Sequence, residues 1–355
     1  MNLSLVGLPR RELAHRLADL GVDADRAVPE LWRAIYTAGA KDLTETRLSK
    51  SIRSRLSGHV DLSRPEIVRD QTSTDGTRKW LIRLFDGELV ETVYIPEEDR
   101  GAVCVSSQVG CTMKCSFCHT GTQPIVRNLT AQEIAAQVVL ARDALGDYQP
   151  GRAGTQASSV VLMGMGEPLL NYDNVLSAIA VMSDSSGLAI SKRKITLSTS
   201  GVVPMIDRLG QDAHVGLAIS LHATTDALRN ELVPVNAKWN IATLLAACSR
   251  YPQTNSRRIL FEYVMLDGVN DSRDDAERLT TLLAPIMAKV NLIPFNPWPG
   301  TRFASSSNER IEAFHARLKE EGIHTPIRWP RGRDIDAACG QLKSASTRKN
   351  RHNSL

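Results

Sequence analysis

Long apolar runs are missing from this chain of 355 residues. No stretch approaches the roughly 20 apolar residues that a membrane-spanning helix needs, so the sequence does not predict a membrane protein. Residues 1–11 contain too short an apolar stretch for a secretory signal peptide. A strong net charge is missing too, because the formal charge of +4 permits a nucleic-acid partner without requiring one. We therefore expect a protein of the cytoplasm, where thiols stay reduced.

Cysteine is scarce and unevenly placed. Of six cysteines, four lie between residues 104 and 118, whereas Cys248 and Cys339 stand apart. A secreted disulfide framework is not expected in a chain this long without a signal sequence. Clustered thiols in a reducing compartment instead indicate metal or redox chemistry. Cys248 ends the apolar run 244–248, and we expect it to be a buried helix residue without a chemical role.

Hydrophobic patterning predicts an α/β fold. From residue 104 onward, strand-like and helix-like segments alternate in about six units, which is typical of a parallel sheet in a partial or full barrel. A capping-box pair, Thr130 and Glu133, predicts the start of the first helix. The strands expected after the first unit are residues 160–163, 195–198, 218–221, 259–264 and 290–293.

Four segments are expected along the chain. Residues 1–70 predict a small helical domain, and residues 71–103 a β-hairpin extension that turns at Asp86-Gly87. Residues 104–342 predict the barrel together with a C-terminal cysteine loop. Residues 343–355 are rich in serine, threonine, asparagine and basic residues, which is typical of a disordered tail.

The N-terminal segment also contains four basic residues with no acid among them: Arg47, Lys50, Arg53 and Arg55. A solvated helix face explains them on sequence alone. Contact with a phosphate backbone is the alternative, and it needs support from elsewhere in the chain.

Cys111, Cys115 and Cys118 are separated by intervals of four and three residues. Three thiolates can bind three irons of a cubane [4Fe-4S] cluster and leave the fourth iron open for a small molecule. A zinc site is the alternative, because His119 can supply the fourth ligand that zinc requires. Zinc sites more often show Cys-x2-Cys pairs, so the spacing favours the cluster.

A glycine-rich segment, residues 163–171, follows the next expected strand. Gly166 permits close approach of the backbone to a ligand, and Glu167 can accept a hydrogen bond from an ammonium group. Further candidates stand at the carboxyl ends of expected strands, where barrel enzymes build their sites, namely Ser198, Ser220, Leu221, His222 and Asn296. Taken singly, each of these is better explained as an ordinary loop residue.

The cysteine spacing, with Phe117 before the last cysteine, resembles that of the radical S-adenosylmethionine superfamily. The resemblance implies a [4Fe-4S] cluster on Cys111, Cys115 and Cys118 in a partial (β/α)6 barrel. It also implies that S-adenosylmethionine binds the open iron, where one electron cleaves it to methionine and a 5′-deoxyadenosyl radical. Residues 163–171 resemble the superfamily's cofactor motif, and the implied cofactor site comprises Gly166, Glu167, Ser198, Ser220, Leu221, His222 and Asn296.

The strings around two other cysteines are more specific. Residues 103–110 around Cys104 and residues 331–342 around Cys339 closely resemble the RlmN/Cfr family of RNA adenine methyltransferases, as does Ser-Leu-His-Ala at 220–223. The resemblance runs from about residue 81 to residue 342. It implies methylation of adenine C2 in 23S ribosomal RNA and transfer RNA, with electrons from a cytosolic donor such as flavodoxin.

The family resemblance assigns a role to each of these cysteines. One S-adenosylmethionine methylates Cys339 by polar displacement and a second is cleaved at the cluster, so each turnover uses two. The radical takes a hydrogen from methylated Cys339, and the resulting methylene radical adds to the adenine as a covalent protein–RNA adduct. Cys104 then attacks the Cys339 sulfur, forming a disulfide and releasing the product, and a reductant restores both thiols. Glu91 matches the family's proposed general base, and a solvated hairpin carboxylate is its alternative.

Other functions stay open. A Cfr-type adenine C8 methyltransferase, an antibiotic-resistance activity, shares the cluster and both auxiliary cysteines. A non-catalytic RNA-binding protein with a structural zinc or iron–sulfur site is the alternative from another class. A glycyl-radical activating enzyme is a third and weaker alternative, because its chemistry gives the strings around Cys104 and Cys339 no role. If the chain acts on RNA, we expect the basic N-terminal residues and the tail to contact it, the tail through Lys343, Arg348, Lys349 and Arg351.

Overall fold

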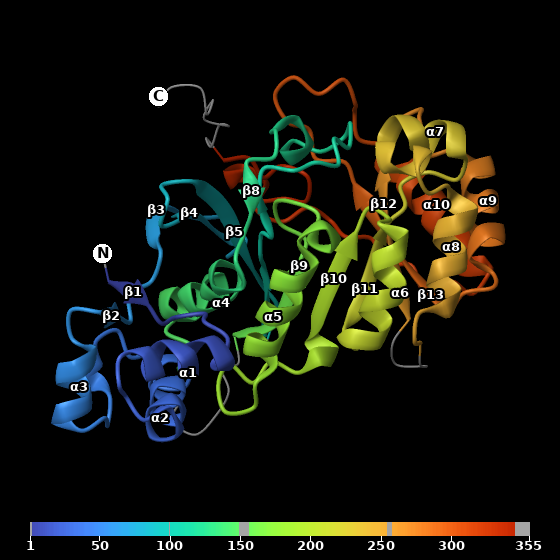
Figure 1. Ribbon diagram of the computed structural model, residues 1–355. Coiled ribbons are helices and arrows are strands. Elements are labelled where there is room, and N and C mark those ends of the chain that lie inside the picture. Colours follow the sequence, from blue (N-terminus) through green and yellow to red (C-terminus); the bar gives the residue numbers. More distant parts are fainter. Residues whose placement is uncertain (1, 99, 149–155, 254–257, 345–355) are drawn as a thin grey trace, which may run out of the picture.

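A curved sheet of nine strands organises the chain in the computed structural model, which describes residues 2–98, 100–148, 156–253 and 258–344 (Figure 1). The strand order is β13-β12-β11-β10-β9-β6-β5-β4-β3. The run from β6 to β13 is parallel, as strand–helix alternation requires. The predicted partial barrel is therefore confirmed, with strands β6 (Gly101–Cys104), β9 (Ala157–Leu162), β10 (Ile195–Thr199), β11 (Gly216–Ser220), β12 (Ile259–Met265) and β13 (Ala288–Pro294).

Three antiparallel strands extend the sheet beyond β6: β3 (Glu66–Thr72), β4 (Arg78–Arg83) and β5 (Leu89–Pro96). The predicted hairpin is confirmed as β4 and β5. The sequence did not predict β3, which starts before the boundary expected at residue 70. β3 is an edge strand exposed along almost its whole length, so no alternation of buried and exposed residues marks it.

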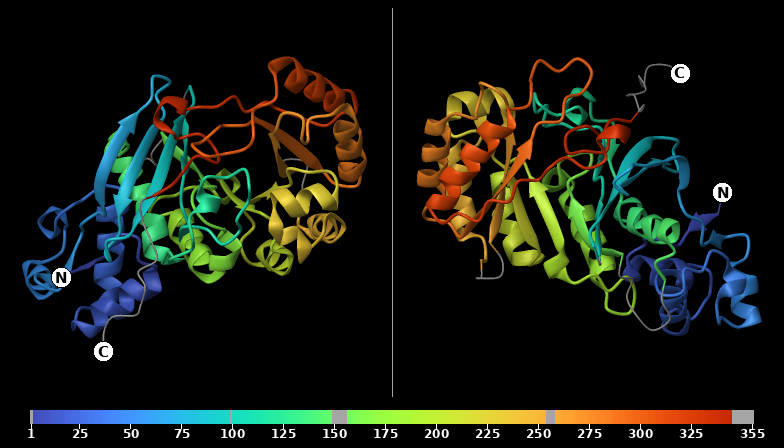
Figure 2. Two further views of the ribbon diagram at one scale, coloured as in Figure 1. Left: turned by 90° about the horizontal axis from the view of Figure 1, so that it is seen from above. Right: turned by 180° about the vertical axis from the view of Figure 1, so that it is seen from behind.

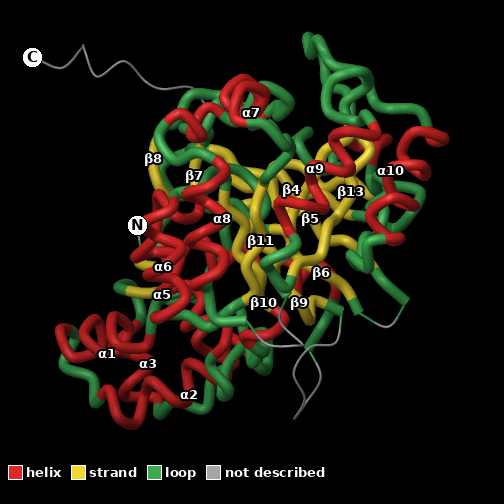
Figure 3. Tube along the Cα trace, turned by 90° about the vertical axis from the view of Figure 1, so that its right-hand side faces the viewer, coloured by secondary structure: helices red, strands yellow, loops and turns green. Residues whose placement is uncertain are grey.

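Helices pack outside the sheet, as Figure 3 shows for the red coils around the yellow strands. The capping box predicted at Thr130 and Glu133 begins α4 with both of its hydrogen bonds present. Cys248 lies fully buried in α8, as expected. The barrel helices are α4 (Ala131–Leu145), α5 (Tyr172–Ser183), α6 (Val203–Asp212), α7 (Asp226–Leu232), α8 (Ile241–Arg250), α9 (Arg273–Leu283) and α10 (Asn308–Glu320).

The N-terminal residues form a separate small group beside α4 and α5 (Figure 1). It contains α1 (Arg10–Asp19), α2 (Ala24–Tyr36) and α3 (Lys50–Leu56), together with the short strand pair β1 (Leu3–Ser4) and β2 (Val60–Asp61). Arg10 joins it to the barrel through an ion pair with Asp184 at 2.6 Å. Lys50 and Arg55 are exposed on α3, whereas Arg53 is half-buried. In the described part of the chain, no helix has the length and apolarity that a bilayer span requires.

The segment after α10 bridges the open side of the barrel. Residues 324–328 first run beside β13, where Leu292 exchanges backbone hydrogen bonds with Pro326 and Arg328. The chain then crosses to the antiparallel strands, where Gly332 donates to Asp75 and Asp334 accepts from Ser73. Figure 2 shows this red segment passing from the region of α10 to β3–β5. Cys339 lies on this crossing.

Candidate active site

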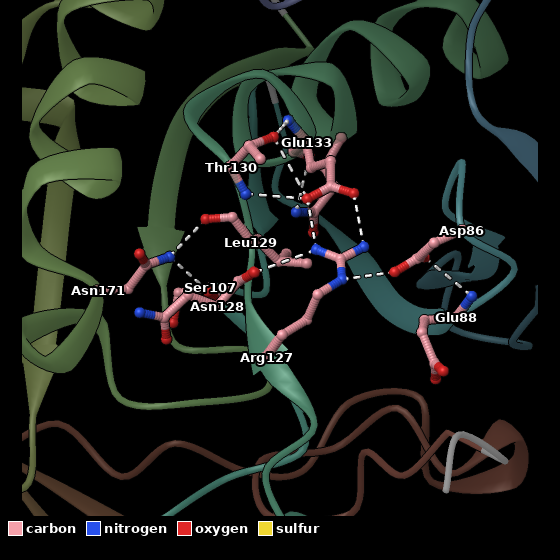
Figure 4. Close-up of polar contacts among 10 residues, drawn as sticks. Asp86, Glu88, Ser107, Arg127, Asn128, Leu129, Thr130, Glu133 and Asn171 are labelled. Atoms are coloured by element: carbon pink, nitrogen blue, oxygen red, sulfur yellow. Dashed lines mark hydrogen bonds and ion pairs between the residues drawn. The ribbon is translucent and has the colours of Figure 1, made fainter. Parts of the chain in front are cut away.

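The three clustered cysteines lie on a loop whose base is closed by a short strand pair. β7 (Gln108–Val109) pairs with β8 (Arg127–Asn128) on either side of the loop. The side-chain amide of Asn171 donates to the carbonyls of Ser107 at 2.8 Å and Leu129 at 2.7 Å, joining the two ends of the loop (Figure 4). The two ends of the loop are thus held together at its base.

Arg127 ties this base to its neighbours. It forms ion pairs with Glu133 at 2.8 Å and with Asp86 at 2.6 Å, and Figure 4 shows its guanidinium between the two carboxylates. Glu133 belongs to the first turn of α4 and Asp86 to the β4–β5 turn. The hairpin extension, α4 and the cysteine loop therefore meet at one side chain.

A cavity opens at the carboxyl ends of the parallel strands, where barrel sites are built. Its empty volume is about 950 Å³, counting the part open to solvent. Most of the residues predicted from the sequence line it: Cys111, Cys115, Cys118, Gly166, Glu167, Ser198, Ser220, His222 and Cys339. Leu221 does not line it, because its side chain is fully buried in the core.

The thiols on this cavity fit a cluster better than a zinc ion. Among the residues that the structure describes, no three His, Cys, Asp or Glu side chains converge on a position for one metal ion. A zinc ligand set has to converge in this way, whereas each thiolate of a cubane cluster binds a different iron. His119, the candidate fourth zinc ligand, instead stacks on Trp298 with ring centroids 4.9 Å apart, and its Nδ1 lies 3.3 Å from the Gln341 carbonyl.

Glu167 offers a fixed, buried carboxylate to the cavity. Its oxygens accept hydrogen bonds from the backbone of Ser200 at 2.8 Å and Leu169 at 3.1 Å. Burial raises the pKa of Glu167, and these bonds oppose the shift. Gly166 has φ +101°, and a Cβ there would meet the Gln108 Cβ at 2.5 Å, so only glycine fits. Both features suit a pocket for a charged ligand that approaches the backbone closely.

His222 is neutral and held in one tautomer. Burial lowers its pKa to about 3, with a further contribution from Arg229. Nδ1 accepts from the backbone of Val264 at 3.1 Å, so the ring proton sits on Nε2. The ring packs edge-on against Phe117 at 4.5 Å. His222 can therefore donate one hydrogen bond from Nε2 but cannot supply positive charge.

Cys104 and Cys339 lie on segments that are far apart in the sequence, and the Cys339 thiol influences the pKa of Cys104. Cys104 ends β6 and is buried, whereas Cys339 is exposed and lines the cavity. Burial raises the pKa of Cys104 to about 12, and the Cys339 thiol adds to the shift. All six cysteines lie among the described residues and are free thiols, so the predicted disulfide between Cys104 and Cys339 is not found in this structure.

Glu91 is not the solvated hairpin carboxylate that the sequence allowed. It is 6% exposed and forms an ion pair with Lys79 at 3.0 Å. Its other oxygen accepts from the backbone N–H of Lys343 at 2.9 Å. Burial raises the pKa of Glu91, and Lys79 opposes the shift. Glu91 lines a second hollow beside the main cavity, with His119, Trp298 and Lys343 among its walls.

Two site residues were missed. Arg229 on α7 is fully buried and donates to the carbonyls of Ser200, Ser220 and Leu221, so it fixes the ends of β10 and β11. An arginine in a short polar helix gives no sequence signal of burial. Glu262 on β12 faces the cavity and accepts from Asn291 at 2.9 Å. Its signal was available, since it is the one charged residue in the apolar strand Ile259–Met265.

Comparisons with known proteins show the family of this chain. A family model of the Radical SAM superfamily matches residues 105–279. The dual-specificity RNA methyltransferase RlmN of Bradyrhizobium diazoefficiens is 57% identical over 353 residues, which cover 96% of this chain and 88% of that protein. The chain belongs to the RlmN family.

A second RlmN relative, from Nitrobacter winogradskyi, is 55% identical over 355 residues and covers 96% of this chain and 89% of its own length. The crystal structure of a radical SAM methyltransferase from Sphaerobacter thermophilus matches with a TM-score of 0.89 and 44% identity. That match covers 96% of this chain and 99% of the other. The RlmN family membership therefore extends over the N-terminal helices as well as the barrel.

Proposed function

We propose that this chain methylates C2 of adenine in 23S ribosomal RNA and transfer RNA, with Cys339 as the methyl carrier. The observation that supports the proposal most directly is the cavity that brings together the three clustered thiols, Glu167 and Cys339. A binder with a structural iron–sulfur site has no use for an exposed thiol on a separate segment that faces the same cavity.

The residues present fit a [4Fe-4S] cluster on Cys111, Cys115 and Cys118 and an S-adenosylmethionine beside it. When bound, this pair supplies the methyl group and the one-electron chemistry that removes a hydrogen atom. Glu167 would accept from the ammonium group of the cofactor, and the Nε2 proton of His222 would hold a further acceptor. Gly166 leaves the space that the cofactor needs at the backbone.

Cys339 carries the carbon between cofactor and RNA. Its thiol loses a proton, and its sulfur takes up the methyl group that a bound cofactor would supply. After loss of a hydrogen atom, the carbon on Cys339 bonds to adenine C2. The resulting radical adduct has to lose the C2 proton and one electron, and a bound cluster would take the electron. Cys104, as a thiolate, then attacks the Cys339 sulfur and forms a disulfide. The bond between the Cys339 sulfur and the bridging carbon breaks with its electron pair on the carbon, which takes up a proton and becomes the methyl group of the base. Two cofactor molecules are consumed per methyl transfer, a cytosolic donor such as flavodoxin supplies the electrons, and a reductant restores both thiols.

Glu91 is the proton acceptor in this proposal. The adducted adenine carbon has to lose its proton before the product is released, and a buried carboxylate beside the segment that carries Cys339 is well placed to take it. The target adenine must leave its stack to reach the cavity, so the RNA is expected to be locally remodelled.

The basic residues of α3 are proposed as contacts to the RNA backbone. Arg348, Lys349 and Arg351 lie outside the described residues, whereas the side chain of Lys343 is exposed and is proposed as a further contact to the RNA. Replacing Lys50, Arg53 and Arg55 by glutamate should weaken RNA binding and reduce its salt dependence. Unchanged affinity and salt slope would remove this contact from the proposal. A cytoplasmic location follows from the RNA substrates.

The deciding experiment is Cys339→Ala, with Cys248→Ala as the matched control. Holoenzyme assembled anaerobically is incubated with unmodified RNA, and the nuclease-digested RNA is analysed by mass spectrometry. We expect 2-methyladenosine from the control and none from Cys339→Ala, with equal iron content in both. Product from Cys339→Ala would refute the carrier role. 8-Methyladenosine from the control would instead support the Cfr-type reaction, and absence of both products and of 5′-deoxyadenosine would support a non-catalytic binder.

A further inference from the structure

A buried ion pair outside the main cavity lies beside the segment that carries Cys339. Lys79 on β4 and Glu91 on β5 are joined at 3.0 Å, and their side chains are 7% and 8% exposed. Leu81 is the direct cross-strand partner of Glu91, so Lys79 lies two residues along β4 on the same face. Two charges buried to this extent are stable only when further hydrogen bonds satisfy them.

Both further hydrogen bonds come from the Cys339 loop, defined here as residues 336–343. The ammonium group of Lys79 donates to the Asp336 carbonyl at 3.1 Å. The carboxylate of Glu91 accepts from the Lys343 N–H at 2.9 Å. These two contacts lie three residues before and four residues after Cys339. A single ion pair therefore holds both ends of the loop.

The middle of the Cys339 loop is held by other groups. The His119 N–H donates to the Gly340 carbonyl at 2.7 Å, and Asn296 donates to the Cys339 carbonyl at 3.2 Å. These are neutral hydrogen bonds from the cysteine loop and from the end of β13. The contacts at the two ends involve charged groups and are the stronger ones.

We propose that the Lys79–Glu91 ion pair is the anchor of the Cys339 loop and that Lys79 is a positioning residue for both Cys339 and Glu91. The inference rests on the proposed function in one respect, namely that Cys339 carries the methyl group and Glu91 accepts the proton. Both oxygens of Glu91 are engaged in this structure. When Glu91 takes a proton it becomes a weaker acceptor for the Lys343 N–H, so proton transfer loosens one end of the loop that holds Cys339.

This arrangement has a use in the proposed reaction. Cys339 has to face the cofactor when it receives the methyl group, and it has to meet Cys104 when the product is released. Because the ionised form of Glu91 anchors the loop, the loop becomes more mobile at the step in which Glu91 takes up the proton. An ion pair that only stabilised the sheet would need no contact with either end of this loop.

The test compares Lys79→Met with Lys79→Arg in the holoenzyme without S-adenosylmethionine. Two readouts report on the loop rather than on methylation: hydrogen exchange of the peptide covering residues 337–344, and the rate at which iodoacetamide alkylates Cys339. Arg83→Met is the matched control, because Arg83 is on the same strand in an exposed ion pair with Glu66.

We expect Lys79→Met to raise both rates about tenfold, since the loop loses a hydrogen bond to a charged group. Lys79→Arg should restore most of the difference, because arginine keeps the charge and the donors. Arg83→Met should leave both rates unchanged. Equal exchange and alkylation rates in wild type and Lys79→Met would overturn the anchor.

Lys79→Met leaves the Glu91 carboxylate buried without its partner, so the variant can fail to fold. The double variant Lys79→Met with Glu91→Gln removes both charges and keeps an acceptor for the Lys343 N–H. It releases the Asp336 end, as Lys79→Met does, without leaving an unpaired buried charge, so both rates should again exceed those of the wild type, and wild-type rates in it would count against the proposal. If the chain had a different catalytic function, the loop rates would still respond to Lys79 while RNA methylation would be absent from the wild type.

Discussion

The side-chain amide of Asn296 donates a hydrogen bond of 3.2 Å to the backbone carbonyl of Cys339. Asn296 follows β13, and Cys339 lies on the segment that crosses the open side of the barrel. The Asn296 oxygen also accepts from Arg333 at 3.4 Å. Asn296, predicted from its place at a strand end as a cofactor contact, thus touches the backbone of the proposed methyl carrier.

Asn296→Ala should slow the loading of a methyl group onto Cys339. Loss of one hydrogen bond in a partly buried place costs about 1 kcal/mol, which corresponds to roughly fivefold in rate if the loop must be ordered for attack. The measurement is the fraction of S-methylated Cys339 in the tryptic peptide over time, with the exposed Asn308→Ala as control. A normal loading rate would contradict the positioning role. A parallel fall in S-adenosylmethionine affinity would show that Asn296 also contacts the cofactor.

Local signals explain why the sequence predicted so much of the barrel. The strands β9 to β13 are apolar runs between helices with caps, and the three cysteines are close in sequence, so neighbouring residues contain the information. Arg229, in contrast, is recognisable only once the carbonyls of Ser200 and Ser220 are in place around it. The same holds for Lys79, whose partners lie at positions 91 and 336. The surroundings of both residues come from segments that are far apart in the sequence, and no local pattern predicts such contacts.

The burial of Glu91 is a second property that the sequence left open. The sequence correctly placed Glu91 in the hairpin. It could not decide whether the carboxylate is solvated or buried. Burial comes from the Cys339 loop, which packs over β4 and β5 from the far end of the chain. β3 was missed for the opposite reason, because an edge strand without a buried face leaves no periodic pattern.

Cys104→Ala should trap the covalent protein–RNA adduct. Cys104 is the buried thiol whose pKa responds to Cys339, and it is the proposed nucleophile that frees the product. Without it, the carbon bridge between Cys339 and the adenine has no sulfur to resolve it. Denaturing gel electrophoresis with labelled RNA should show a shifted protein band in this variant and little in wild type or in Cys248→Ala. Free methylated RNA at the wild-type yield would contradict the assignment.

Asn171→Leu should weaken the cysteine loop. The variant removes the amide that donates to Ser107 and Leu129, and the Leu129 carbonyl then lacks that donor in a buried place. We expect the free energy of unfolding to fall by about 1–3 kcal/mol and the iron content after reconstitution to fall with it. Asn174→Leu is the control, because it removes only the bond to the Asn171 oxygen and leaves both amide contacts. Equal iron content and stability in the two variants would show that this clamp is dispensable.

Glu262 should make the folded state less stable as the pH rises through neutrality. It faces the cavity from β12, pairs in register with Ser220 and Asn291, and has Arg328 and Cys339 as its charged or titratable neighbours. Burial raises its pKa from 4.5 to about 7, against the lowering effect of the Asn291 hydrogen bond and of Arg328. The folded state therefore favours the neutral acid. The stability from this carboxyl group is fully present below the pKa of the unfolded chain and is lost as the pH passes about 7.

Between about pH 6 and about pH 8 the expected loss is roughly 1 kcal/mol. Below about pH 7 the folded state holds a proton that the unfolded chain has already released, and above it neither state holds the proton, so the loss levels off. Glu262→Gln keeps the acceptor for Asn291 and cannot ionise, so its stability should change less over the same range. Urea unfolding of the anaerobic holoenzyme at both pH values measures the difference, with the exposed Glu66→Gln as control. If Glu262→Gln and wild type lost the same stability between the two pH values, Glu262 would be ionised in the fold throughout, and the cavity floor would carry a negative charge at neutral pH.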